Sequence, residues 1–229
     1  MIILVTGTRK GIGRFLVEYY SSFGHQVIGC SRLESDYVAV NYDHYCLDIT
    51  NEKEAKQMFS KIRKSYGQLD VLINNAGIAS MNHVLLTPIE TVNAILNTNV
   101  GGTYLFCRES AKLMRSSGHG RIINFATVAT PLKLEGEAIY AASKAAVVCL
   151  TEIFSRELAD YGITVNAIGP TPVKTDLIQS IPQDRIQALI QRQAIKRYGE
   201  YDDIVNVVDF FIRPESNFIT GQVVYLGGV

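Results

Sequence analysis

Two side chains that can move a proton lie four residues apart in the sequence Tyr140-Ala-Ala-Ser-Lys144. On a helix this spacing places the tyrosine and the lysine on one face, about one turn apart. A free tyrosine titrates near pH ~10, so it is a poor proton donor at neutral pH. A neighbouring ammonium favours the phenolate and lowers that pKa toward the working range, which acid/base catalysis requires. We therefore expect Tyr140 and Lys144 to form a catalytic pair.

The alternative for this pair is a core aromatic side chain beside a solvated surface lysine. The helix around the pair is rich in alanine and valine, over Ala141–Val147. An unpartnered lysine buried on such an apolar helix is costly. The composition of the helix therefore favours a functional role for Lys144.

A glycine-rich turn precedes the pair by more than half of the chain, in the sequence Thr6-Gly-Thr-Arg-Lys-Gly-Ile-Gly13. It follows an apolar run that predicts a strand, Ile2–Val5, and it opens a helical pattern over Ile12–Phe23. Glycines permit a tight turn and a close approach of the backbone to a pyrophosphate, which then meets the helix N-terminus. A purely structural turn is the alternative. The dinucleotide contacts that we expect here are Gly7, Arg9, Lys10, Gly11, Ile12 and Gly13.

Further motifs follow in the order Asn74-Asn-Ala-Gly77, Asn97-Thr-Asn99, Val165-Asn-Ala-Ile-Gly-Pro170 and Thr220-Gly-Gln-Val-Val-Tyr-Leu-Gly-Gly228. Together with the glycine-rich turn and the tyrosine–lysine pair, they make the chain resemble the short-chain dehydrogenase/reductase family over essentially its whole length. Within this family the chain looks most like the 3-oxoacyl-carrier-protein reductases. The resemblance implies hydride transfer with a nicotinamide cofactor.

The resemblance also implies roles for the reacting groups. Tyr140 is the general acid or base, and Lys144 binds the nicotinamide ribose and lowers the tyrosine pKa. The family serine that orients the substrate carbonyl is replaced by Thr127, which keeps the hydroxyl and adds a methyl group. Asn99 matches the family asparagine whose backbone holds a water beside the lysine; an ordinary buried polar side chain is the alternative.

Other family positions imply contacts with the cofactor. Asp48 and the backbone amide of Ile49 hold the adenine, although Asp48 could also cap the following helix. Small residues after the fourth strand adjoin the adenosine ribose, although the two asparagines there could instead tie neighbouring strands together. The loop after the sixth strand holds the carboxamide and the phosphates, but it carries Thr171 where the family has glycine. The residues expected in these contacts are Asp48, Ile49, Asn75, Ala76, Gly77, Pro170, Val173 and Thr175. The segment from Asp176 to Arg197 should cover the substrate, with apolar contacts from Leu177, Ile178 and Ile181.

The choice between NADH and NADPH depends on the end of the second strand. An NAD-binding chain is expected to place a carboxylate there for the ribose 2′-hydroxyl, but this chain has Ser31 followed by Arg32. Lys10 adds a second cation within the glycine-rich turn. Two cations favour a 2′-phosphate, so we expect NADP(H) as the cofactor. Glu34 nearby and a purely solvated Arg32 are the counter-arguments.

Apolar runs alternate with helical patterns along the 229 residues, which predicts βαβ units and a parallel sheet. We expect an α/β fold: a single Rossmann-type doubly wound domain over residues 1–229, with a seven-stranded, mostly parallel sheet and helices on both faces. The expected strands are Ile2–Val5, Gln26–Cys30, Tyr45–Leu47, Val71–Ile73, Arg121–Phe125, Thr164–Ala167 and Gln222–Leu226. The expected helices are Ile12–Phe23, Glu52–Tyr66, Ile89–Ser116, Ile139–Tyr161, Asp184–Gln193 and Asp202–Ile212.

The composition limits the classes of partner. Lys+Arg and Asp+Glu both number 22, so no global field attracts nucleic acid or an anionic membrane. We see no leader and no apolar run of the ~20 residues that a membrane span needs, and we expect a cytoplasmic protein. The histidines lack the spacing of metal ligands, so no metal is expected. The cysteines, which we expect to be buried thiols in a reducing compartment, are Cys30, Cys46, Cys107 and Cys149.

Two hypotheses about function remain. The first is an NADPH-dependent oxidoreductase that reduces a small-molecule carbonyl, or oxidises the alcohol, with a 3-oxoacyl thioester as one candidate substrate. The second is a non-catalytic NADP(H)-binding regulatory or scaffolding protein with the same fold. The predicted helices Ile89–Ser116 and Ile139–Tyr161 carry apolar residues on more than one face, so we also expect a homodimer or homotetramer.

Overall fold

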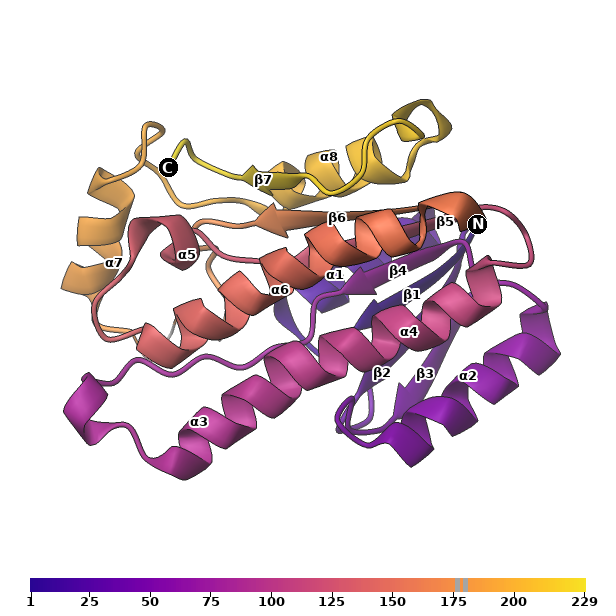
Figure 1. Ribbon diagram of the computed structural model, residues 1–229, viewed down its shortest axis with the longest axis horizontal. Coiled ribbons are helices and arrows are strands. Elements are labelled where there is room, and N and C mark those ends of the chain that lie inside the picture. Colours follow the sequence, from indigo (N-terminus) through magenta and orange to yellow (C-terminus); the bar gives the residue numbers. More distant parts are fainter. Residues whose placement is uncertain (176–177, 179–180) are drawn as a thin grey trace.

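The computed structural model describes residues 1–175, 178 and 181–229, and its centre is one parallel sheet (Figure 1). The strands lie in the order β3-β2-β1-β4-β5-β6-β7, and each neighbouring pair is parallel. Their bounds are β1 Ile2–Thr6, β2 Gln26–Ser31, β3 Tyr42–Cys46, β4 Val71–Asn74, β5 Gly120–Phe125, β6 Ile163–Gly169 and β7 Val223–Tyr225. The expected α/β, doubly wound architecture is confirmed, with a sheet that is parallel throughout these pairs.

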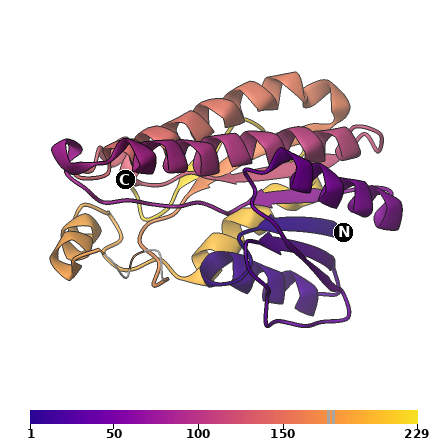
Figure 2. The ribbon, with the colours of Figure 1, turned by 90° about the horizontal axis from the view of Figure 1, so that it is seen from below.

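Helices cover both faces of the sheet (Figures 1 and 2). One apolar core joins the sheet to α2, α4 and α6, and a second joins it to α1 and α8. Because both faces are covered, the central strands are buried along their whole length, which explains their continuous apolar sequences. The helix bounds are α1 Gly11–Ser22, α2 Glu52–Tyr66, α3 Ile89–Leu96, α4 Thr103–Met114, α5 Ala129–Leu132, α6 Ala138–Glu157, α7 Gln183–Gln191 and α8 Tyr201–Ile212.

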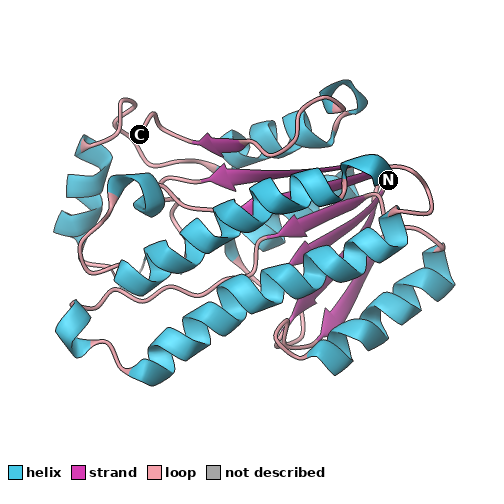
Figure 3. Ribbon diagram, in the orientation of Figure 1, coloured by secondary structure: helices cyan, strands magenta, loops and turns pink. Residues whose placement is uncertain are grey.

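The strand arrowheads all point to one side of the sheet (Figure 3). The strand order reverses between β1, which pairs with β2, and β4, which continues toward β5. In an open α/β sheet, ligands bind beyond the carboxyl ends of the strands at this reversal. The fold thus brings the glycine-rich turn after β1 and the loop after β4 to the same end of the sheet.

The edge strand β3 differs from its sequence prediction. It begins at Tyr42 rather than Tyr45, and it pairs in register with Val27–Ser31 of β2. The missed residues include Asp43, which is exposed, and His44, which is half-buried. An edge strand covered on one side keeps polar residues, so the apolar pattern that predicted the central strands was absent here.

The predicted helix Ile89–Ser116 is interrupted by a π-helical turn, Asn97–Gly102, between α3 and α4. A side chain on Gly102 would come within 2.6 Å of the Ile49 side chain, so this turn packs closely on the loop after β3. π-helical turns are rare, and they often occur at functional sites. This one contains Asn99, whose side chain is completely buried.

Helix α6 bears on the expectation that the chain has no apolar run long enough to span a membrane. Within the described part of the chain, it is the one helix whose 20 residues and mean hydropathy of 1.4 match a membrane span by length and composition. It packs on β5 and β6 of the sheet. Core helices of globular proteins pass the same test, so this one helix is only weak evidence for a membrane.

The cysteines are also only partly as expected. Cys30 and Cys107 are buried, and burial raises the pKa of each thiol to about 12. Cys46 and Cys149 are exposed, because they lie on the edge strand β3 and on the outer part of α6. The expectation of a buried thiol is therefore wrong for these two.

Candidate active site

The glycine-rich turn leaves no room for a side chain at Gly7 or Gly13. Gly7 has a φ of +74°, and a Cβ on Gly13 would lie 2.3 Å from the carbonyl oxygen of Gly7. This contact lets α1 start directly against the end of β1. Helix α1 has no side-chain cap from its N-cap residue, Lys10, and its first residues, Gly11 and Ile12, line the cleft, where a helix N-terminus suits a pyrophosphate. The turn fits the dinucleotide expected from the sequence.

A cleft of about 500 Å³ runs from this turn along the ends of β2, β3 and β4. It is lined by most of the predicted contacts, namely Gly7, Arg9, Lys10, Gly11, Ile12, Arg32, Asp48, Ile49, Asn75, Ala76, Gly77 and Thr175. Gly13 is absent from the lining because it packs behind Gly7 and Asn75. Sequence spacing thus predicted the cleft, but it could not show which of these residues face the cleft and which pack behind its wall.

Cations gather at the outer end of this cleft. Arg9, Lys10 and Arg32 are exposed and line it, whereas Glu34 does not. The Glu34 carboxylate is instead directed to the Cys46 thiol. The pKa of that thiol is raised mainly by burial and secondly by the hydrogen bond with Glu34. The counter-argument from Glu34 therefore has no geometric support, and this end of the cleft fits a phosphate.

Beneath these cations lies a polar cluster that the sequence did not reveal. Ser31 Oγ lies 3.1 Å from His44 Nε2, and His44 Nδ1 lies 2.8 Å from the Tyr42 hydroxyl. The Tyr42 hydroxyl also donates to Thr8 Oγ1 at 3.2 Å. The cluster fixes Ser31 beside Arg32. The sequence prediction missed this cluster because the predicted third strand began after Tyr42 and His44.

The alternative roles of the polar residues after β3 and β4 have different outcomes: Asp48 does not cap α2, whereas the asparagines do join strands. Asp48 Oδ1 accepts from the Thr50 backbone at 2.9 Å, while Asn51 caps α2. Asn74 Nδ2 donates to Asn124 Oδ1 at 2.9 Å, which joins β4 to β5. Asn75 Nδ2 donates to the Thr6 carbonyl at 2.9 Å, which joins β4 to β1. The asparagines therefore tie strands together, and Asn75 still lines the cleft.

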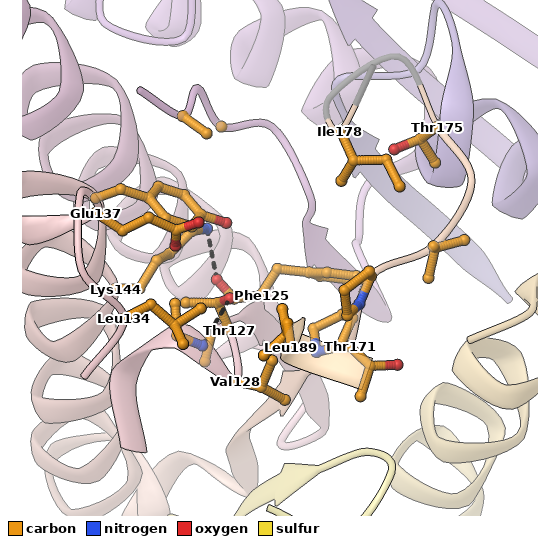
Figure 4. Close-up of a pocket in the computed structure, with 18 of the residues that line it drawn as sticks. Phe125, Thr127, Val128, Leu134, Glu137, Lys144, Thr171, Thr175, Ile178 and Leu189 are labelled. Carbon is orange, nitrogen blue, oxygen red and sulfur yellow. Dashed lines mark hydrogen bonds between the residues drawn. The ribbon is translucent and has the colours of Figure 1, made fainter. Parts of the chain in front are cut away.

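A second cavity, of about 150 Å³, adjoins the cleft and holds the predicted reacting groups (Figure 4). Thr127 follows β5, and Tyr140 and Lys144 lie in the first turns of α6. The Thr127 hydroxyl lies close enough to the Tyr140 hydroxyl to lower the Tyr140 pKa. Ile12, Asn75, Gly77, Ala79 and Thr175 line both spaces, so the cleft and the cavity are continuous.

The electrostatics of Tyr140 and Lys144 correct the sequence prediction. Burial, and then the charge of Glu137, raise the pKa of Tyr140 to about 12, while the hydrogen bond from Thr127 lowers it. Burial lowers the pKa of Lys144 to about 8. Lys144 Nζ donates to the Phe125 carbonyl at 2.6 Å (Figure 4). Lys144 is not among the groups that shift the Tyr140 pKa, so the expected lowering by the lysine is wrong for this arrangement, in which desolvation dominates.

Asn99 lies behind the cavity rather than in its lining. Its Oδ1 accepts from the Ile78 backbone, and its Nδ2 donates to the Ile78 carbonyl, both at 2.9 Å. Nδ2 also lies 3.0 Å from Ser143 Oγ on α6. A Cβ on Gly77 would lie 3.2 Å from Asn99 Oδ1 and 3.5 Å from Lys144 Nζ. Asn99 thus fixes the loop after β4 against the helix that carries the lysine.

The loop after β6 accommodates its unusual threonine. Thr171 is buried, and a Cβ on Gly199 or Gly227 would lie within 2.8 Å and 2.7 Å of its side chain. Those two glycines therefore leave the space that Thr171 fills. The loop residues Pro170, Val173 and Thr175, for which we expect cofactor contacts, line the cavity, and Thr175 also lines the cleft.

The expected substrate cover is partly within the described residues. Ile178 and Ile181 line the cavity, and Leu189 of α7 joins them. Asp176 and Leu177 lie outside the described residues. The cavity also contains a side chain that the sequence analysis missed, the carboxylate of Glu137, three residues before Tyr140.

Comparison with known proteins agrees with this geometry. A family model described as enoyl-(acyl carrier protein) reductase matches residues 7–228. The 3-oxoacyl-(acyl-carrier-protein) reductase FabG of Escherichia coli (strain K12) is 32% identical over 233 residues, covering 99% of this chain and 96% of that protein. FabG of Thermotoga maritima is 28% identical over 236 residues, with the same coverage.

Solved structures resemble the whole chain as well. ElxO with NADP bound gives a TM-score of 0.89 at 30% identity, covering 98% of this chain and 96% of ElxO. A 4-hydroxyisoleucine dehydrogenase complexed with NADH gives a TM-score of 0.88 at 26% identity, covering 99% and 97% of the two chains.

The chain belongs to the short-chain dehydrogenase/reductase family. It is an NAD(P)-dependent oxidoreductase, and the NADP(H) expected from the sequence is the cofactor bound in the ElxO structures. The non-catalytic alternative is not favoured, because Tyr140, Lys144 and Thr127 surround one cavity and the relatives are named as reductases and dehydrogenases.

Proposed function

We propose that the protein reduces a small-molecule carbonyl to an alcohol with NADPH, or catalyses the reverse reaction. The observation that carries the proposal is the continuity of the two spaces: Tyr140, Thr127 and Lys144 surround the cavity, and the cavity opens into the cleft of the glycine-rich turn. Arg9, Lys10 and Arg32 supply the cations for a 2′-phosphate. Residues 1–229 act as one cofactor-binding domain in this proposal.

Each reacting side chain has a defined role. NADPH, when bound, supplies a hydride for the carbonyl carbon. Thr127 Oγ1 orients the carbonyl oxygen by a hydrogen bond. The Tyr140 hydroxyl gives its proton to that oxygen, and its high pKa keeps the proton in place at neutral pH until negative charge develops. The Lys144 ammonium binds the ribose hydroxyls and stabilises the phenolate that remains on Tyr140.

The lining of the cavity supports a compact and largely apolar substrate. Its walls away from the hydroxyls are apolar, with contributions from Val128, Leu134, Ile181 and Leu189. The similarity to FabG proteins makes a 3-oxoacyl thioester one candidate. Other small ketones suit the same walls.

The protein acts in this proposal as a cytoplasmic homodimer or homotetramer, without a nucleic acid or membrane partner. Support comes from the exposed outer faces of α4 and α6, where Tyr104 and Ile153 are each 44% exposed. Only 33% of the apolar window of α6 is buried within one chain. A second copy of the chain would cover these faces. Light scattering at micromolar concentration tests this assembly, and a monomeric mass would contradict it.

The reaction is tested by following NADPH absorbance with a panel of ketones, aldehydes and 3-oxoacyl thioesters. We expect NADPH oxidation with at least one carbonyl and formation of one equivalent of alcohol. NADPH binding without turnover across the panel would instead favour the non-catalytic alternative.

A further inference from the structure

Glu137 places a carboxylate in a cavity whose walls are otherwise mostly apolar. It is the one acidic side chain among the described lining residues, and it is half-buried beside apolar walls (Figure 4). Burial raises the pKa of this carboxyl, so the protein gains nothing in stability by keeping it there. Polar groups that are held in this way at an active site commonly serve function.

None of the described residues satisfies this carboxylate. Glu137 is the N-cap residue of α6, yet its side chain accepts no hydrogen bond from the first turn. Glu200 is the N-cap residue of α8, and its side chain does accept from the first-turn backbone. The nearby Lys144 ammonium donates to the Phe125 carbonyl rather than to Glu137. The carboxylate therefore retains its hydrogen-bonding capacity for a molecule in the cavity.

Its position relative to Tyr140 limits what that molecule can be. Residues three apart at the start of a helix have Cβ atoms about 5–6 Å apart. A substrate whose carbonyl oxygen meets Tyr140 can reach Glu137 with a group two or three bonds from the carbonyl carbon. A carboxylate accepts hydrogen bonds and attracts positive charge, and it repels a second carboxylate.

We propose that Glu137 is a specificity-determining residue that binds a hydrogen-bond donor, a hydroxyl or an ammonium group, on a substrate whose reacting carbonyl faces Tyr140. The inference rests on the proposed carbonyl reduction and names its substrate class: hydroxyketones or aminoketones, and the corresponding diols or amino alcohols. Substrates with a carboxylate at that position are disfavoured.

The test compares matched substrates with the NADPH-loaded enzyme. Butan-2-one lacks a donor, whereas 4-hydroxybutan-2-one and protonated 4-aminobutan-2-one carry one, and 4-methoxybutan-2-one carries an ether oxygen that can only accept. We expect kcat/KM to be about tenfold to hundredfold higher with a donor than for butan-2-one. In Glu137→Leu this ratio should fall to about one, mainly through KM. Glu137→Gln, which keeps an amide oxygen, should retain part of the preference for the hydroxyl and lose that for the ammonium.

Glu135→Gln is the matched control, because Glu135 is exposed and lies outside the cavity lining. It should keep the wild-type ratio. An equal ratio in wild type and Glu137→Leu, or a wild-type preference for 4-methoxybutan-2-one over both donor substrates, would overturn the proposal.

A binding experiment separates this proposal from the proposed function. Titration calorimetry of butan-2-ol, butane-1,3-diol and 4-aminobutan-2-ol into the NADP⁺-loaded protein requires no turnover. Tighter binding of the donor-bearing alcohols that is lost in Glu137→Leu supports the role of Glu137 even where no carbonyl of the panel is reduced. Equal binding of all three by the wild-type protein contradicts it, whatever the activity.

Discussion

The cofactor cleft and the substrate cavity both lie at the carboxyl ends of the strands, but they are built in different ways. The cleft is shaped by backbone: Gly7 and Gly13 bring β1 and α1 into contact, and the Asn75 side chain bonds to the end of β1. The cavity is shaped by side chains, with Thr127, Glu137 and Tyr140 around an apolar interior. Backbone contacts at the glycine-rich turn fit the part of the ligand that both nicotinamide cofactors share, whereas side chains decide the substrate in the cavity and, at Arg32, the choice of cofactor.

The largest effect is expected from a change confined to the cavity. Tyr140→Phe removes the proton donor and keeps the ring, so turnover should fall by ~10²–10⁴-fold. NADPH affinity should stay within about twofold, because the cleft is untouched. Steady-state kinetics and NADPH fluorescence titration measure the two quantities. Near-normal reduction by this variant would refute the assignment of Tyr140.

A change confined to the cleft should reduce cofactor affinity instead of removing the proton donor. Arg32→Ala removes a charged partner of the 2′-phosphate, so NADPH affinity should fall about tenfold to hundredfold. NADH affinity should be unchanged, since NADH lacks that phosphate. Arg63→Ala, an exposed arginine on α2, is the control and should affect neither cofactor. If the wild-type protein binds both cofactors equally well, the NADPH assignment fails.

Thr127 tests how much one hydroxyl of the cavity contributes. Thr127→Ala removes a hydrogen-bond donor to the carbonyl oxygen, and kcat/KM should fall by about tenfold or more. Thr127→Ser keeps the donor and removes only the methyl group, so activity should be retained. Assays of both variants with one substrate separate the hydroxyl from the methyl. Full activity of the alanine variant would remove Thr127 from the mechanism.

The smallest effect that we expect is a pH dependence of kcat/KM that arises from Lys144 in the cavity lining. Burial lowers the Lys144 pKa to about 8, so rising pH removes the ammonium that serves ribose and phenolate. The kcat/KM for reduction should fall about threefold between pH ~7.5 and ~8.5. Lys144→Arg keeps its charge throughout this range, so its residual activity should not fall there. An identical decline in both proteins would show that another group titrates.

The same contrast explains what could be predicted from the sequence. The central strands were predicted because burial on both faces leaves continuous apolar runs, as in β4 and β6. The cleft was predicted because glycines at fixed spacing have few other uses. Glu137 was missed because one carboxylate before a helix has no pattern, and its direction depends on tertiary packing. The Tyr140 pKa was misjudged because spacing along a helix says nothing about desolvation.

The position of the residues after β7 affects where a purification tag can be attached. The Ala194 and Ile195 amides donate to the Gly228 and Gly227 carbonyls, each at 3.0 Å, so the last residues hold the segment that follows α7. Met1 lies at the opposite end of the sheet, where its carbonyl accepts from Gln26 (Figure 1). A purification tag after Val229 would therefore start beside the wall of the substrate cavity, whereas a tag before Met1 would start far from it. Affinity handles for the assays above belong at the amino end.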